Sequence, residues 1–491
     1  SGFSLLKSQY ILGGNKMKKD SKSKEMIQSE KRGSTRLLMM VLSLSVLVGA
    51  ITADLVNPVL PLISKDLEAS KSQVSWIVSG IALVLAIGVP IYGRISDFFE
   101  LRKLYIFAIM ILASGSLLCA IATNLPLLVL GRMVQGAGMS AIPVLSVIAI
   151  SKVFPQGKRG GALGIIAGSI GVGTAAGPIF GGVVGQYLGW NALFWFTFLF
   201  AIMIVIGAYY ALPTIKPAES VGSNKNFDFI GGLFLGLTVG LLLFGITQGE
   251  TSGFSSFSSL TSLIGSVVAL VGFIWRIVTA ENPFVPPVLF NNKDYVNTVI
   301  IAFFSMFAYF AVLVFVPLLV VEVNGLSSGQ AGMILLPGGV AVAILSPFVG
   351  RLSDRFGDKR LIITGMTLMG LSTLFLSTYA SGASPLLVSV GVLGVGIAFA
   401  FTNSPANNAA VSALDADKVG VGMGIFQGAL YLGAGTGAGM IGALLSARRD
   451  ATEPINPLYI LDAMSYSDAF LAATGAILIA LIAGLGLKKR G

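Results

Sequence analysis

The chain has 491 residues, of which 55% are hydrophobic and only 11% are charged. Soluble globular proteins typically carry about 25% charged residues, so this composition excludes them and indicates a polytopic membrane protein. The 32 Lys and Arg residues outnumber the 22 Asp and Glu residues, but they are scattered at the ends of apolar runs and predict no nucleic-acid patch. With one Cys and no His, disulfide frameworks, thiolate or imidazole metal sites and His-based catalysis are excluded.

The chain begins with a polar stretch. Residues 1–16 precede Met17 and have the character of an extended leader or cloning remnant. Residues 17–36 are rich in Lys, Ser and Glu and predict a disordered segment. We therefore expect residues 1–36 to form a cytoplasmic tail, matched by a short basic tail at 488–491.

Fourteen apolar runs are long enough to cross a hydrocarbon core, which takes roughly 20 residues. Their arrangement predicts an N-terminal six-helix bundle (37–212), a linker with two inserted helices (213–294) and a C-terminal six-helix bundle (295–487). The runs are 37–63, 74–95, 104–122, 125–151, 161–186, 190–212, 229–247, 260–279, 295–320, 328–350, 361–380, 384–408, 419–446 and 467–487.

Basic residues in the connections predict the orientation. Cytoplasmic loops of membrane proteins carry an excess of Lys and Arg, and here the even-numbered gaps between runs are basic while the odd-numbered gaps hold few basic residues. Both tails are basic as well. Both termini are therefore expected in the cytoplasm, with the protein a multi-pass protein of the cell membrane.

One charged motif occurs twice. Gly93-Arg-Ile-Ser-Asp97 lies between the second and third apolar runs, and Gly350-Arg-Leu-Ser-Asp354 repeats it 257 residues later. In each copy a Gly ends an apolar helix, an Asp follows and basic residues close a tight turn, which suits a cytoplasmic hairpin. Two copies in corresponding places indicate two related halves. The residues assigned to this motif are Gly93, Asp97, Arg102, Lys103, Gly350, Asp354, Arg355, Gly357, Lys359 and Arg360.

The repeated motif resembles the loop between the second and third helices of major facilitator superfamily transporters. The second copy keeps the later glycine of that signature as Gly357, whereas the first copy has Glu100 there. With two helices inserted between the halves, the whole chain from about Arg36 resembles the fourteen-helix drug/proton antiporter branch, which includes multidrug and tetracycline-type efflux transporters. The resemblance implies an all-α major facilitator fold with a substrate site near the midplane.

Two ionisable residues stand well inside the first six runs. Asp54 lies roughly 16 Å from the outer boundary and Arg132 roughly 12 Å from the same side, at 1.5 Å per residue, so they share a depth. Intramembrane charges are costly and usually functional, although a static ion pair holding the two helices together is the structural alternative. The surrounding residues resemble family motifs of the first and fourth helices, and that resemblance implies that Asp54 and Arg132 take part in proton coupling.

The fifth run carries small residues at spacing four and one proline. This spacing allows close helix approach, and Pro178 bends the helix, so tight packing alone could explain it. The segment also resembles the antiporter motif that separates exporters from importers in the superfamily. Its residues are Gly173, Gly177, Pro178, Gly181 and Gly182.

Two positions bear on the substrate. Fourteen-helix tetracycline exporters, which this chain resembles around Gly435-Thr436-Gly437, have acids where this sequence has Thr174 and Ala434. A lipophilic drug is therefore favoured over a tetracycline chelate as the substrate. In one version of the hypothesis this drug is a cation. Aromatic faces with sparse polar groups suit such ligands, although aromatic residues at helical spacing are more often packing residues. The predicted substrate cavity comprises Asn57, Gln135, Phe307, Tyr309, Asn403, Asn407, Gln427 and Tyr431.

Together these features predict a proton-coupled antiporter that exports lipophilic drugs by alternating access, giving multidrug efflux and antibiotic resistance. Its only coupling partner would be the proton, with no cofactor, and one two-half chain would suffice as a monomer. The motif would latch the outward-facing state through Asp97 with Arg102 or Lys103, and through Asp354 with Arg355 or Arg360. Alternatives are a tetracycline-specific exporter and a facilitator of a metabolite or lipid. A membrane enzyme or sensor is disfavoured, because the spans carry no catalytic constellation and no soluble segment is long enough to fold alone.

Overall fold

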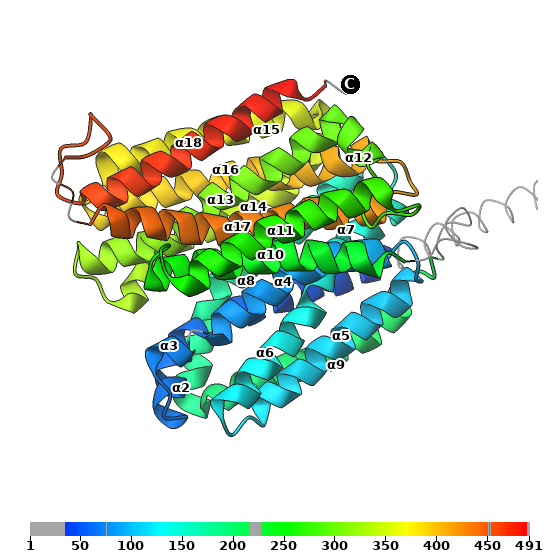
Figure 1. Ribbon diagram of the computed structural model, residues 1–491, viewed down its shortest axis with the longest axis horizontal. Coiled ribbons are helices and arrows are strands. Elements are labelled where there is room, and N and C mark those ends of the chain that lie inside the picture. The colour runs from blue at the N-terminus through cyan, green and yellow to red at the C-terminus, as the bar shows by residue number, and fades with distance from the viewer. Residues whose placement is uncertain (1–34, 75, 216–226, 450, 452, 489–491) are drawn as a thin grey trace, which may run out of the picture.

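The computed structural model describes residues 35–488, except residues 75, 216–226, 450 and 452 (Figure 1). Within this part of the chain, fourteen helical segments are long and apolar enough to cross a membrane, which confirms the predicted number. The described residues form helices, turns and loops and no strand. The expected N-terminal tail, apart from its last two residues, and residues 489–491 of the C-terminal tail lie outside the described residues.

The first spanning segment, Thr35–Asp66, is broken in its second half. Its main helix, which we call the first helix, covers 35–54, and a 3-10 turn η1 (Asn57–Val59) leads into α2 (Leu60–Asp66). Pro58 and Pro61 account for the break, because proline has no backbone N–H to donate to the preceding turn. Asp54 is consequently the last residue of the first helix.

The remaining segments of the N-terminal bundle are continuous except for one. The fourth, Leu125–Val153, divides at Ser140, three residues before Pro143 removes a backbone hydrogen bond. Asn124 begins this segment with its side chain accepting a hydrogen bond from the N–H of Leu127. The elements are α3 (Lys71–Val74), α4 (Trp76–Ile95), α5 (Leu101–Ala120), α6 (Leu125–Met139), α7 (Ala141–Val153), α8 (Arg159–Leu188) and α9 (Trp190–Ala211).

The inserted helices are α10 (Phe229–Ser252) and α11 (Phe257–Thr279), followed by the short α12 (Val288–Asn291). Side chains of Asp228 and Ser256 cap their N-termini. Helix α10 packs against both α4 of the N-terminal bundle and α17 of the C-terminal bundle. Figure 1 shows α10 and α11, in green, crossing the front of the molecule between these two bundles.

The C-terminal bundle repeats the arrangement of the first. The repeated motif aligns α14 with α4, so by the order of the spans α13 corresponds to the first helix and α17 to α8. Helix α15 ends in a π-helical turn, η3 (Leu376–Ala380). The elements are α13 (Lys293–Glu322), α14 (Ser328–Phe356), α15 (Asp358–Phe375), α16 (Pro385–Ala413), α17 (Val419–Ala447) and α18 (Met464–Gly486).

The two bundles meet along two seams, one between α8 and α14 and the other between α4 and α17. Both seams lie near the end of the molecule that carries Asp97 and Asp354, which we call the motif end. Glycines bring the backbones together there: a Cβ atom on Gly350 would lie 2.0 Å from the carbonyl oxygen of Gly160, and one on Gly93 would lie 2.3 Å from the Cα of Gly424. Only residues without a side chain permit these approaches.

Candidate functional site

The two motif aspartates bind the N-termini of helices in the opposite bundle. The carboxylate of Asp354 accepts hydrogen bonds from the backbone N–H groups of Gly160 and Gly161, both at 2.9 Å, at the start of α8. Asp97 accepts one from the N–H of Val421 at 3.2 Å, at the start of α17. A helix N-terminus carries unpaired N–H groups and a partial positive charge, so each carboxylate ties the bundles together.

The predicted basic partners of these aspartates were wrong. Asp97 forms its ion pair with Arg94 at 3.3 Å, while Lys103 pairs with Glu100 at 3.1 Å and Arg102 lies over the ring of Tyr209. Sequence proximity suggested Arg102 and Lys103, but both lie on α5, beyond the turn, and point elsewhere. The sequence reasoning missed Arg94, although its recurrence as Arg351 directly after the repeated glycine was a usable signal.

The second copy of the motif departs from its predicted pairing in the same way. Among the described residues, neither Arg355 nor Arg360 has a carboxylate oxygen within 4 Å, and Arg355 lies over the ring of Phe356. Lys359 instead donates to the carbonyl oxygens of Leu485 and Leu487, at the end of α18. The basic residues of this copy therefore do not neutralise Asp354 directly.

The turns of the two copies differ for a structural reason. Gly357 has φ of +83°, a conformation that favours glycine, and it alone separates α14 from α15. In the first copy α4 ends at Ile95 and a longer turn leads to Glu100, whose φ of −60° suits any residue. The loss of the later glycine in the first copy thus follows from a longer turn.

Burial changes the acidity of Asp97, which lies between the spans. Removal from water raises its pKa from 3.8 to about 6, while the charge of Arg94, the hydrogen bonds from Arg94 and Val421 and the charge of Lys152 act in the opposite direction. Arg94 itself also donates to the carbonyl oxygen of Pro283 at 3.3 Å. Pro283 belongs to the linker after α11, so this arginine joins the motif to the inserted segment.

Arg132 is fully buried and holds the end of the first helix. It donates to the carbonyl oxygens of Thr52 at 3.0 Å and Ala53 at 3.4 Å. These carbonyls belong to the last turn of the first helix, where backbone acceptors lack intrahelical partners and a cation is favourable. It also donates to Ile77 and Gln135, and Gln135 donates onward to Ser116.

Asp54 and Arg132 therefore lie near each other, as predicted. They do not form the static ion pair that was the structural alternative. The described residues place no guanidinium within 4 Å of the Asp54 carboxylate and give it no hydrogen bond. Asp54 is half-buried, and Tyr309 of α13 lies within electrostatic range of it. The acid of one bundle thus approaches a predicted substrate residue of the other.

The glycines of α8 contact two different partners. In the half of α8 near the motif end they face α14, then Gly173 and Gly177 face the first helix, and the glycines from Gly181 onward face the residues that follow it. A Cβ atom on Gly177 would lie 3.1 Å from the Cβ of Asp54, and one on Gly181 would lie 1.9 Å from the carbonyl oxygen of Leu55. Pro178 lies within the segment against the first helix. The predicted antiporter motif therefore packs directly on the helix that carries Asp54.

The predicted substrate residues fall into separate groups. Gln427 of α17 donates to Asn407 of α16 at 2.9 Å, and Asn407 donates to Asn403 at 2.8 Å, so these three form one polar chain. Tyr309 stacks on Phe399 with ring centroids 4.1 Å apart, and Phe307 lies beside Phe303 on the same helix.

Three other residues do not join this chain. Gln135 is bound to Arg132 and Ser116 inside the N-terminal bundle, Asn57 is exposed at the start of η1, and Tyr431 packs in the apolar cluster that contains Leu243 of α10. Their assignment to a substrate cavity remains a prediction. Within the described part of the chain, one cavity lies on the α8/α14 seam and another lies beside Asp358 and Lys359, and none of the predicted substrate residues lines either of them.

The described part of the chain contains two six-helix bundles, fourteen spanning segments and helix ends that interlock between the bundles. This combination defines a class of protein, the polytopic membrane transporters. The chain belongs to the Major Facilitator Superfamily, whose members are transporters and not enzymes: the family matches residues 42–438 and, separately, residues 298–489. The second match covers the C-terminal bundle, as expected for an internal repeat.

Similar proteins include bacterial resistance proteins. The multidrug resistance protein Stp of Mycobacterium tuberculosis is 28% identical over 424 residues, 85% of this chain and 77% of Stp. The lincomycin resistance protein LmrB of Listeria monocytogenes is 28% identical over 362 residues, 73% of this chain and 76% of LmrB. The crystal structure of the human organic anion transporter MFSD10 has a TM-score of 0.67 at 15% identity, covering 91% of this chain and 99% of MFSD10, and shares the fold.

Proposed function

We propose that this protein exports lipophilic small molecules, antibiotics among them, in exchange for protons across the cell membrane. The observation that carries the proposal is the position of Asp54, which ends the first helix, packs on Gly177 of the antiporter motif and lies within electrostatic range of Tyr309. The names of Stp and LmrB support resistance by efflux as the biological role.

The chemistry of Asp54 suits coupling. Its carboxylate has neither ion pair nor hydrogen bond among the described residues, so no contact must be broken when it takes up or releases a proton. Arg132 is fixed on the carbonyls just before it and supplies a constant nearby positive charge. A cationic or polar substrate beside Tyr309 would then compete with the proton for the same acid.

The contacts at the motif end support alternating access. The basic residues in the even-numbered gaps support our proposal that this end, with both termini, lies in the cytoplasm. The aspartate contacts and glycine approaches close the bundles together there, which corresponds to an outward-facing state. Opening of both seams would admit substrate from the cytoplasm or the inner leaflet. One chain contains both bundles, so a monomer is the proposed working unit.

The test uses everted vesicles with an acidic interior and a pH-sensitive dye. Lipophilic cations, quinolones and tetracycline are added in turn to wild type, Asp54→Asn and the control Asp417→Asn, whose residue is exposed in the loop before α17. We expect substrate-dependent proton release in wild type and in the control, and none in Asp54→Asn. Transport against a gradient by Asp54→Asn would refute the coupling role, and a response to tetracycline alone would favour the tetracycline-specific alternative.

A further inference from the structure

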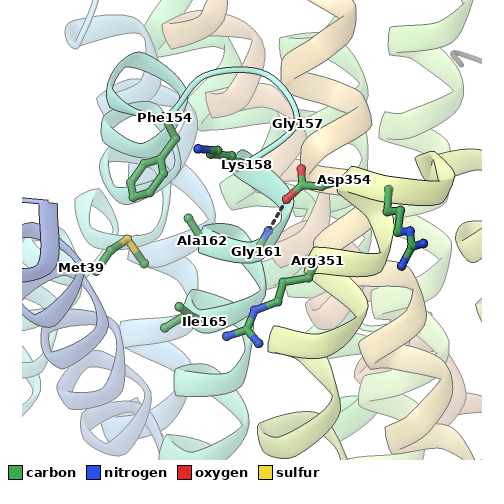
Figure 2. A pocket seen from close by; sticks show the side chains of 10 residues that line it. Met39, Phe154, Gly157, Lys158, Gly161, Ala162, Ile165, Arg351 and Asp354 are labelled. Carbon is green, nitrogen blue, oxygen red and sulfur yellow. Dashed lines mark hydrogen bonds between the residues drawn. The ribbon is translucent and has the colours of Figure 1, made fainter. Parts of the chain in front are cut away.

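A cavity of about 540 Å³ opens at the motif end, on the seam between α8 and α14. Three basic residues line it: Lys158 precedes α8 in the N-terminal bundle, and Arg351 and Arg355 lie on α14 in the C-terminal bundle. Figure 2 shows Lys158 extending toward Phe154 and Arg351 toward Ile165, both on the side of the seam where Met39 lies. The cavity therefore collects positive charge from both bundles.

These basic residues lack anionic partners. Among the described residues, Lys158, Arg351 and Arg355 have no carboxylate oxygen within 4 Å, and the side chains of Lys158 and Arg351 donate no hydrogen bond. Asp354 also lines the cavity, but its two oxygens accept the N–H groups of Gly160 and Gly161. The carboxylate is thus already engaged, and the cavity keeps an excess of positive charge.

In the α4/α17 seam, the counterpart of Arg351 has hydrogen-bond acceptors. Arg94 is the repeat counterpart of Arg351, since each directly follows the glycine of its motif. Arg94 donates both to Asp97 and to the carbonyl oxygen of Pro283 in the linker after the inserted helices. Among the described residues, the inserted segment packs on the α4/α17 seam, and no residue provides Arg351 with an equivalent acceptor.

An apolar and exposed face of α14 adjoins the cavity at Arg351, whose guanidinium lies over the ring of Phe348. Ile344, Phe348 and Arg351 are spaced four and three residues apart, which puts them on one face of α14. Ile344 is 56% exposed and Phe348 59%, and Ile165 of α8 lines the cavity on the opposite side. A free phosphate would use the cations only, whereas a phospholipid would use the apolar face as well.

We propose that the α8/α14 cavity binds the headgroup of an anionic phospholipid, with its acyl chains along Phe348 and Ile344. The phosphate oxygens accept hydrogen bonds from Arg351 and Lys158, as the carbonyl oxygen of Pro283 accepts one from Arg94 in the α4/α17 seam. Because the cations come from both bundles, the bound lipid holds the motif end closed. This site depends on the fold and not on which substrate is transported.

The test measures lipid binding to the purified full chain by native mass spectrometry, with added phosphatidylglycerol or phosphatidylcholine. The variant is Lys158→Gln with Arg351→Gln, and the matched control is Lys293→Gln with Lys488→Gln, two exposed residues at the same end. We expect wild type and control to prefer phosphatidylglycerol and the variant to bind it about 25-fold more weakly, at roughly fivefold per basic side chain. Size-exclusion chromatography verifies that all three proteins are folded.

Two results would overturn the proposal. One is equal binding of the two lipids by wild type, or equal binding of phosphatidylglycerol by the variant and the control. The other comes from thermal unfolding of wild type with excess inorganic phosphate in place of lipid. If phosphate raises the unfolding temperature as much as phosphatidylglycerol does, the apolar face contributes nothing and the occupant is not a lipid.

Discussion

The guanidinium of Arg94 joins two segments that lie 189 residues apart, donating to the carbonyl oxygen of Pro283 at 3.3 Å while it pairs with Asp97. The pairing makes the inserted segment part of the closed motif end, because the linker after α11 and the motif after α4 share one side chain. Helix α10 adds to this by packing on both α4 and α17. The inserted helices therefore reinforce the α4/α17 seam.

Arg94→Gln should loosen the α4/α17 seam, because it removes the ion pair to Asp97 and weakens the bond to Pro283. Cys119 is the only cysteine of the sequence, so a Cys119→Ser background allows spin labels at the exposed positions Phe99 and Asp417. Double electron–electron resonance should show a longer mean distance in Arg94→Gln than in the background protein. The control Arg360→Gln lies at the same end and has no carboxylate partner among the described residues, so it should leave the distance unchanged.

Acidification should favour the closed motif end. The pKa of Asp97 is about 6 when the seam is closed and returns toward 3.8 when water reaches it. The closed state therefore binds the proton more tightly, so closure gains stability as the pH falls through about 6 and loses it as the pH rises. The same label pair should report more closed protein at about pH 5 than at about pH 7. Opening on acidification, or an unchanged pH response in Asp97→Asn, would contradict this assignment.

Gly350→Ala should separate the bundles at the α8/α14 seam. Its Cβ would meet the carbonyl oxygen of Gly160 at 2.0 Å, and backbone cannot yield as a flexible side chain does. We expect a destabilisation of the closed state by about 1–3 kcal/mol and slower export. Gly332→Ala is the matched control on the same helix, since its Cβ would meet nothing within 4 Å. Equal export by the two variants would show that the close approach is not required.

Gly181→Ala should displace the segment that follows Asp54, because its Cβ would lie 1.9 Å from the carbonyl oxygen of Leu55. The adjacent Gly182→Ala is the control, since its Cβ would make an ordinary contact with Pro58 at 3.8 Å. We expect Gly181→Ala to lose substrate-dependent proton release and to unfold at a lower temperature, with a cost of about 1–3 kcal/mol. Gly182→Ala should behave as wild type in both measurements.

The sequence by itself determined the fourteen spans, the two repeats and the placement of the inserted helices between them. These are local properties: a span needs a sufficient apolar length, and a repeated motif such as Gly93 to Asp97 and Gly350 to Asp354 is visible without any contact. The shared depth of Asp54 and Arg132 followed from the helical rise alone. The fold class could therefore be predicted almost completely.

Only the tertiary structure decided which groups those residues meet. Asp97 and Asp354 bind the N–H groups of Val421 and of Gly160 and Gly161, and Arg132 binds carbonyls just before Asp54. Sequence reasoning sought charged side chains as partners, but inside a closely packed bundle unpaired backbone groups at helix ends satisfy charges equally well. Backbone groups are the same at every position, so their availability depends on where helices end and how closely glycines let them approach.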